Sequence, residues 1–100
     1  MKNSRYIIFN QNETKSQIEA AQPEMTQVEH TIANYFLNNE EMTDFSSKRI
    51  SALLYVSEAT LSRFAKKCGF KGYREFIFAY EKDLKEENNG AVSEKDITLF

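Results

Sequence analysis

The chain has 100 residues, of which 41 % are apolar and 13 % aromatic, and it carries a net charge of −2. This length and apolar content suit one modest hydrophobic core, and a second independent core is not expected. The total charge argues against a general polyanion binder, and the single cysteine excludes an intramolecular disulfide. No apolar segment approaches the length needed to cross a bilayer, so we expect a cytoplasmic protein without membrane contact or targeting segment.

Helix breakers are scarce, with three glycines and one proline, and we therefore expect an all-α protein, a compact bundle of about five helices. The first expected helix is short, covers residues 12–21 and is closed by Pro23. Thr26 and Glu29 have the spacing of a capping box, which predicts that a second helix begins there and runs to Asn38. Its apolar stripe consists of Val28, Ile32, Ala33, Tyr35, Phe36 and Leu37.

Residues 39–44 allow a further short helical turn before the third helix. Ser46 and Ser47 then offer an N-cap for a helix over residues 48–54. The residues expected to face inward on this helix are Ile50, Leu53 and Leu54.

Ser57 begins the fourth expected helix, because its hydroxyl can accept a hydrogen bond from one of the free amides at the helix start. This helix runs to Cys68, and Gly69 is a suitable left-handed terminator. The last long helix follows Gly72 and is expected to end in the polar segment 85–90. Its apolar stripe consists of Tyr73, Phe76, Ile77, Tyr80 and Leu84.

Positive charge collects between residues 46 and 74, where seven bases and one acid give a local charge of +6 and leave −8 on the rest of the chain. On the fourth helix the apolar residues form one stripe, and the opposite face is small, polar and basic. Such a face fits the major groove of a duplex, and the basic start of the preceding helix can hold a phosphate. Two short helices, a tight turn and a basic second helix predict a helix-turn-helix that binds double-stranded DNA.

Base edges or adjacent phosphates are expected to contact Ser57, Ala59, Thr60, Ser62 and Arg63. The DNA backbone is expected to contact Lys48, Arg49, Lys66, Lys67, Lys71 and Arg74.

The same region resembles a known family. The string ISALLYVSEATLSRF at residues 50–64, with GFKGY at residues 69–73, is similar to the N-terminal DNA-binding domain of RpiR-type bacterial transcriptional regulators, and residues 25–42 are similar to its first helices. Its specific patterns are formed by Ser57, Thr60, Arg63 and Phe64, and by Gly69, Phe70, Gly72, Tyr73, Glu75 and Phe76. The resemblance implies a regulator of sugar metabolism genes, whose effector domain follows outside these residues and binds a phosphorylated sugar. The chain departs from the usual pattern at Tyr55, where glycine is common in the turn, and at Ser51, where alanine is common.

Several residues invite other interpretations. Cys68 falls on an apolar stripe without a neighbouring histidine, so a buried hydrophobe is expected rather than a nucleophile. His30 is the single histidine and is expected at the surface, since one histidine without companions makes no zinc site. No catalytic pattern, phosphate loop or metal-ligand spacing is present, and we expect neither an enzyme nor a cofactor.

These observations divide the chain into an N-terminal segment with a short helix (residues 1–24), a helix-turn-helix domain (residues 25–88) and the start of a linker (residues 89–100). Phe78 points away from the stripe of its helix, which suggests a contact between helices in a homodimer. The alternative is a helical protein-protein interaction module, whose basic face docks an acidic partner and whose apolar tail, residues 97–100, seeks a groove.

Overall fold

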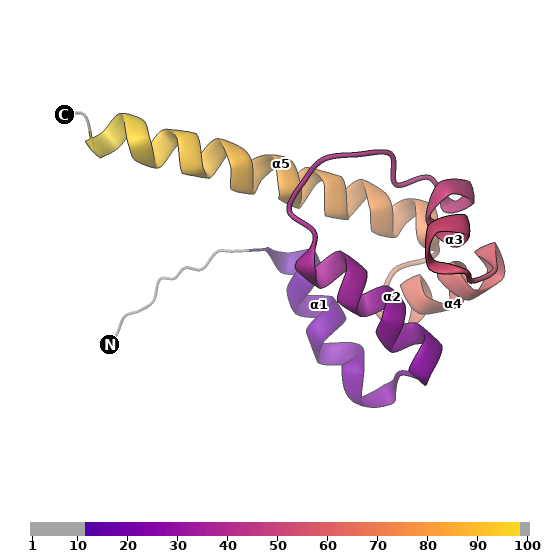
Figure 1. Cartoon of the computed structure of the whole chain (residues 1–100). Helices are drawn as coiled ribbons and strands as arrows, with labels where there is room; N and C mark the ends of the chain where they lie inside the picture. The colour runs from indigo at the N-terminus through magenta and orange to yellow at the C-terminus, as the bar shows by residue number, and fades with distance from the viewer. Residues whose placement is uncertain (1–11, 99–100) are drawn as a thin grey trace.

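The computed structural model describes the backbone of residues 12–98 and the side chains of residues 12–88. In the described range the helices are α1 (Glu13–Ala21), α2 (Gln27–Asn38), α3 (Ser47–Leu54), α4 (Glu58–Lys67) and α5 (Tyr73–Thr98), with a 3₁₀ turn at Gln22–Glu24. The first four helices gather at one end of α5, as Figure 1 shows. The prediction of an all-α bundle of about five helices is confirmed. No helix in the described range is both long and apolar enough to cross a membrane.

An aromatic cluster occupies the centre of the bundle. Phe36 on α2 is fully buried, and its ring meets the rings of Phe76 and Tyr80 edge to face, at centroid distances of 4.9 and 5.0 Å. This geometry places the positive edge of one ring against the negative face of the next. The aliphatic residues that complete the buried core are Ile18, Ile32, Ile50, Leu61 and Leu84.

The predicted helix starts are confirmed by hydrogen bonds from backbone amides. Thr26 and Glu29 form both bonds of the capping box that begins α2. The hydroxyl oxygen of Ser46 accepts from the amide of Arg49 at the start of α3, and Ser57 caps α4 in the same way. Each capping bond joins residues within four positions of one another in the sequence, so it forms independently of the rest of the fold.

The predicted end of α4 is also confirmed. Gly69 has a φ of 102°, in the left-handed region that favours glycine. Its amide donates to the carbonyl of Lys66, and the amide of Phe70 donates to the carbonyl of Ala65, both at 3.0 Å. These two bonds form a Schellman ending, which turns the chain toward α5.

The short helical turn expected at residues 39–44 is not formed, since residues 39–46 make a loop that reaches from α2 to α3 across α5 (Figure 1). Phe45 anchors this loop, because its side chain is buried and its carbonyl accepts a hydrogen bond from the hydroxyl of Tyr73 at 2.7 Å. An extended chain reaches this anchor point, whereas a helical turn of the same residues is shorter.

The expected end of the last helix is wrong. The last helix does not end in the polar segment 85–90, because α5 continues to Thr98. Lysine and glutamate are strong helix formers, and a single glycine inside a helix costs only about 1 kcal/mol. The apolar residues Ile97, Leu99 and Phe100 lie outside the described side chains, and residues 1–11 lie outside the described chain.

Two apolar side chains expected in the core are exposed instead, Val28 by 46 % and Leu53 by 45 %. Val28 lies in the first turn of α2, at the edge of the bundle. Leu53 lies on α3, a helix of eight residues that packs chiefly on α4, so its buried stripe is narrow. Ile50 is the fully buried residue of that stripe.

Candidate nucleic-acid interface

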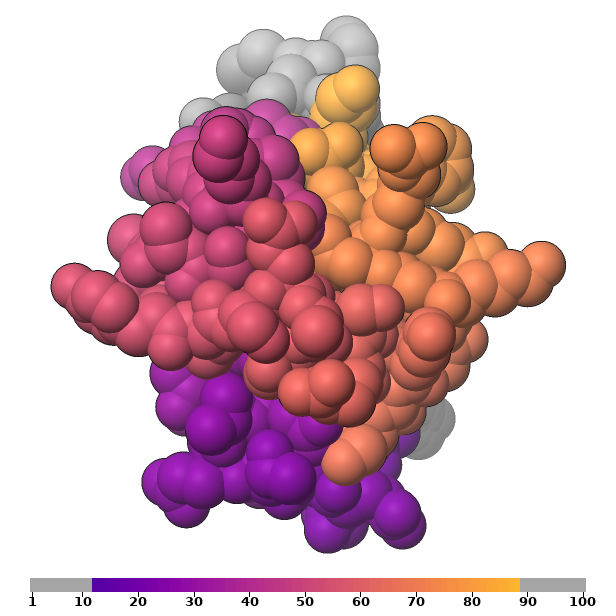
Figure 2. Space-filling view, turned by 90° about the vertical axis from the view of Figure 1, so that its right-hand side faces the viewer, coloured from indigo at the N-terminus to yellow at the C-terminus, as the bar shows by residue number. Residues whose placement is uncertain are grey.

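Helices α3 and α4 and the first turns of α5 share one face of the molecule. Figure 2 shows this face, with residues of α3 and α4 in pink to salmon at its centre and the start of α5 in orange beside them. Helix α4 packs against α2, α3 and α5, so its inner stripe is held by three partners. Its outer side is therefore left as a presented surface.

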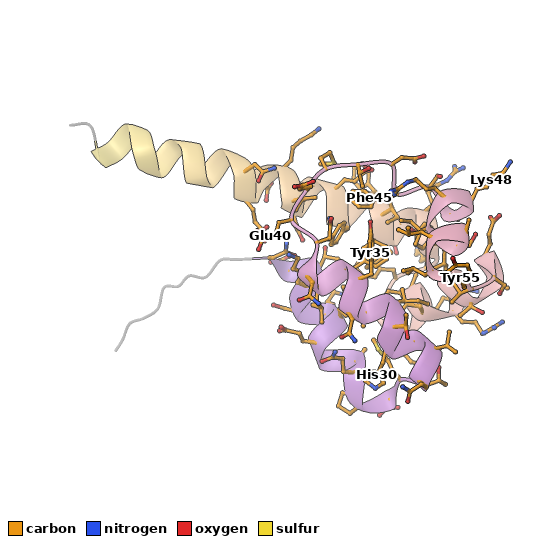
Figure 3. All side chains as sticks on the ribbon, in the orientation of Figure 1. His30, Tyr35, Glu40, Phe45, Lys48 and Tyr55 are labelled. Carbon is orange, nitrogen blue, oxygen red and sulfur yellow. The ribbon has the colours of Figure 1, made fainter. Side chains whose placement is uncertain are left out.

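The turn between α3 and α4 has a left-handed residue in spite of its side chain. Tyr55 has φ 59° and ψ 44°, and its amide donates to the carbonyl of Ser51. The amide of Val56 donates to the same carbonyl at 3.0 Å. The departure from glycine therefore leaves a left-handed turn, and Tyr55, at the junction of α3 and α4 (Figure 3), has an exposed ring.

The exposed face of α4 begins with a row of hydrogen-bonded side chains. The hydroxyl of Ser57 lies 2.8 Å from that of Thr60, whose oxygen accepts from Nη2 of Arg63 at 3.2 Å. Thr60 and Ser62 are half-buried, whereas Ser57, Ala59 and Arg63 are exposed. The five residues expected near bases thus belong to one short surface of α4, and the row holds the Arg63 guanidinium against the helix.

A second hydrogen bond joins the starts of the two helices. The hydroxyl of Ser47 donates to Oε1 of Glu58 at 2.8 Å. Glu58 is the acid in the first turn of α4, where a carboxylate is favoured by the positive end of the helix dipole. Glu58, the one acid among residues 46–74, therefore has a structural partner, a contact that no sequence pattern indicated.

The start of α3 lies next to the start of α5. Arg49 donates from Nη1 to the carbonyl of Asp44 at 2.7 Å, which holds its guanidinium near the loop before α3. Lys48 projects outward from the same end of the molecule (Figure 3). A shallow hollow between these elements is lined by Phe45, Ser46, Ser47, Tyr73, Arg74 and Ile77. Arg74 therefore extends the basic surface from α3 onto α5.

The seven bases of this region differ in whether they have internal partners. All seven are exposed in whole or large part. Of these seven, Lys67 alone forms a salt bridge with a carboxylate among the side chains of residues 12–88, through Nζ and Oε1 of Glu29 at 2.7 Å. The remaining bases, which have no such partner in that range, are Lys48, Arg49, Arg63, Lys66, Lys71 and Arg74. They leave a field of uncompensated positive charge around α4.

Glu29 is a buried carboxylate with two donors. Burial by itself raises its pKa, but the hydrogen bond and charge of Lys67 and the amide of Thr26 outweigh burial and lower the pKa below its ordinary value. The capping box predicted the bond from Thr26. The sequence did not predict the bond from Lys67, because the two residues are 38 positions apart.

Cys68 and His30, the residues considered for other chemistry, lie in environments that suit structural side chains. Cys68 is buried, and burial raises the pKa of its thiol to about 12, which keeps it protonated and unreactive at neutral pH. His30 is half-buried at the lower end of α2 (Figure 3). Among the described residues, no group of three or more histidine, cysteine or acidic side chains has the arrangement of a metal site.

A pair of short helices joined by a tight left-handed turn, with a polar and basic outer face on the second helix, defines the helix-turn-helix class of DNA-binding domains. A sequence model of the helix-turn-helix domain of the rpiR family matches residues 11–87 of this chain. The chain therefore belongs to that family, and the domain is a DNA-binding domain of an RpiR-family regulator. A comparison with curated proteins gave no match.

Proposed function

We propose that this domain recognises a specific DNA sequence by inserting α4 into the major groove. The observation that carries the proposal is the exposed face of α4, where small and polar side chains start the helix and bases without a carboxylate partner surround it. Bases or adjacent phosphates are contacted by Ser57, Ala59, Thr60, Ser62 and Arg63. The DNA backbone is contacted by Lys48, Arg49, Lys66, Lys71 and Arg74, whereas Lys67 is considered separately because Glu29 already pairs with it.

Arg63 is the residue most suited to read a base. Its side chain is exposed and, among the described residues 12–88, is hydrogen-bonded only to the Thr60 hydroxyl, a weak partner that it can exchange for a base edge. An arginine in the major groove binds O6 and N7 of guanine in a bidentate manner, and this is the commonest specific contact. The nearby lysines carry point charges and suit phosphates better.

The whole protein, on this proposal, is a cytoplasmic homodimer that controls genes of sugar or sugar-phosphate metabolism. A C-terminal domain outside this chain binds a phosphorylated sugar and changes the affinity for DNA, as the family resemblance implies. Phe78, which is 72 % exposed on α5, supports a contact between two copies. Two copies read two half-sites, which multiplies a weak single-domain affinity.

Three alanine variants test the base-reading role on selected and scrambled duplexes. Arg63→Ala should weaken binding to the selected site by about 1–3 kcal/mol and relax the preference at one position of each half-site. Lys66→Ala should weaken both duplexes equally and reduce the slope of log affinity against log salt by about 0.9. Lys85→Ala is the matched control, because Lys85 is an exposed base on α5 outside the proposed contact set, and it should change neither property.

Equal and sequence-blind losses from Arg63→Ala and Lys66→Ala would refute base reading by Arg63. An equal loss from Lys85→Ala would mean that net charge, and not a defined face, determines binding. Failure of the unaltered domain to retain any duplex at low salt would favour the interaction module with a basic docking face.

A further inference from the structure

The salt bridge between α2 and α4 is built differently from an ordinary surface pair. Oε1 of Glu29 accepts from Nζ of Lys67 at 2.7 Å and from the amide of Thr26 at 2.9 Å. Nζ of Lys67 also donates to the carbonyl of Glu24 at 3.0 Å. Glu29 is only 5 % exposed, so its charge depends on these donors for compensation. One carboxylate thereby ties the start of α2 to the end of α4.

This pair is one of three tethers on α4. At the start of the helix, Glu58 accepts from Ser47 on α3. Just beyond its end, the carbonyl of Cys68 accepts from Nε2 of Gln17 on α1 at 3.0 Å. The bond between Lys67 and Glu29 adds α2, so each tether joins α4 to a different neighbouring helix. Because the outer face of α4 packs on nothing in the described chain, its tilt follows from its inner stripe and these tethers.

The engaged ammonium of Lys67 has a second consequence. Two of its three N–H donors are taken by a carboxylate oxygen and a backbone carbonyl of the same domain. If Lys67 bound a DNA phosphate instead, the buried Glu29 carboxylate would lose its ion-pair partner, which is unfavourable. Lys66, the preceding residue, is exposed and has no carboxylate partner among the described side chains.

We propose that Glu29 is a positioning residue for DNA recognition, which acts through Lys67 to fix the tilt of α4, and that Lys67 is not a phosphate contact. The inference rests on the proposed function, since it concerns how α4 is presented to the duplex. The two adjacent lysines then have different roles, because Lys67 is structural and Lys66 binds DNA.

The test compares Lys67→Met with Lys66→Met, each of which removes one charge and retains an apolar stem. Lys67→Met should lower the ratio of affinities for selected and scrambled duplexes by about tenfold, as expected when a base contact is misplaced. It should leave the salt slope unchanged. Lys66→Met should lower the salt slope by about 0.9 and leave the ratio unchanged. Lys67→Arg, which keeps the charge and the donors, should restore the ratio.

Folding and positioning are separated by a double variant. Lys67→Met leaves a buried carboxylate unpaired, whereas Glu29→Gln/Lys67→Met removes both charges and keeps an oxygen that can accept from the Thr26 amide. The double variant should therefore fold as stably as Lys67→Arg, yet show the same reduced ratio as Lys67→Met. A normal ratio in the stably folded double variant would overturn the positioning role.

Hydrogen exchange of the native domain gives a result that does not depend on DNA. The amides of Gly69 and Phe70, which close the end of α4, should exchange at least about tenfold faster in the double variant, while amides in the middle of α2 keep their protection. Unchanged exchange at the end of α4 would overturn the inference. If the unaltered domain shows no sequence preference at all, the proposed function fails, and the exchange result alone decides whether the tether exists. A salt slope lowered equally by Lys67→Met and Lys66→Met would make Lys67 a phosphate contact and refute the proposal.

Discussion

Replacement of Tyr55 by glycine should stabilise the domain. Tyr55 is 94 % exposed, so the substitution removes almost no buried surface. A side chain in the left-handed conformation costs about 1–2 kcal/mol, and Tyr55 has this conformation with φ 59°. The greater freedom of glycine in the unfolded chain takes back about 0.4–1 kcal/mol. The free energy of unfolding should therefore rise by about 0.5–1 kcal/mol.

Thermal and urea denaturation measure this change directly. For a domain of this size, the expected gain corresponds to a rise in Tm of about 3–6 °C. Tyr55→Ala is the matched control, because alanine also loses the exposed ring but keeps the strained Cβ atom, and it should lie within about 0.5 kcal/mol of the unaltered domain. If Tyr55→Gly is no more stable than Tyr55→Ala, the turn stores no steric strain and the reasoning is refuted.

Three further predictions concern stability. Gly69→Ala should destabilise the domain by about 1–2 kcal/mol, because alanine at this position must adopt the left-handed conformation and its Cβ would lie 3.1 Å from Nε2 of Gln17. Equal urea midpoints for Gly69→Ala and the unaltered domain would contradict this prediction. Phe36→Ala should cost about 3–5 kcal/mol, since it empties the centre of the aromatic cluster, and a loss below 2 kcal/mol in chemical denaturation would show that the cluster collapses around the gap. Glu29, whose folded-state pKa is lowered from 4.5, contributes stability that is present above pH 4.5 and lost as the pH falls through the lower folded value. The difference in unfolding free energy between the unaltered domain and Glu29→Gln should therefore shrink on acidification below pH 4.5, and a difference that grows would contradict the sign.

The features predicted correctly from sequence are those that act over a few residues. The caps at Thr26, Ser46 and Ser57 need only a side-chain oxygen and an amide two or three positions ahead, so their spacing alone identifies them. Gly69 likewise ends its helix through its own backbone freedom. Periodicity also located the buried stripe of α4, which contains Leu61 and other core residues.

The features that were missed depend on how helices pack. Lys67 and Glu29 meet because the end of α4 lies against the start of α2, and Ser47 meets Glu58 because α3 and α4 begin side by side. Hydrophobic periodicity within a helix does not predict such contacts between side chains of different helices. The buried anchor at Phe45 was missed for the same reason, since its carbonyl partner belongs to α5. Predictions of contact with DNA stay predictions, because they concern a partner outside the chain.

Selection from a library of randomised duplexes at moderate salt shows whether the outer face of α4 reads DNA sequence. We expect enrichment of a two-fold symmetric site, with half-sites separated by about 10 base pairs or a multiple of that distance. Arg63→Ala, selected in parallel, should lose the preference at one position in each half-site. Retention of duplexes without sequence enrichment, or no retention even at low salt, would contradict the reading of sequence by α4.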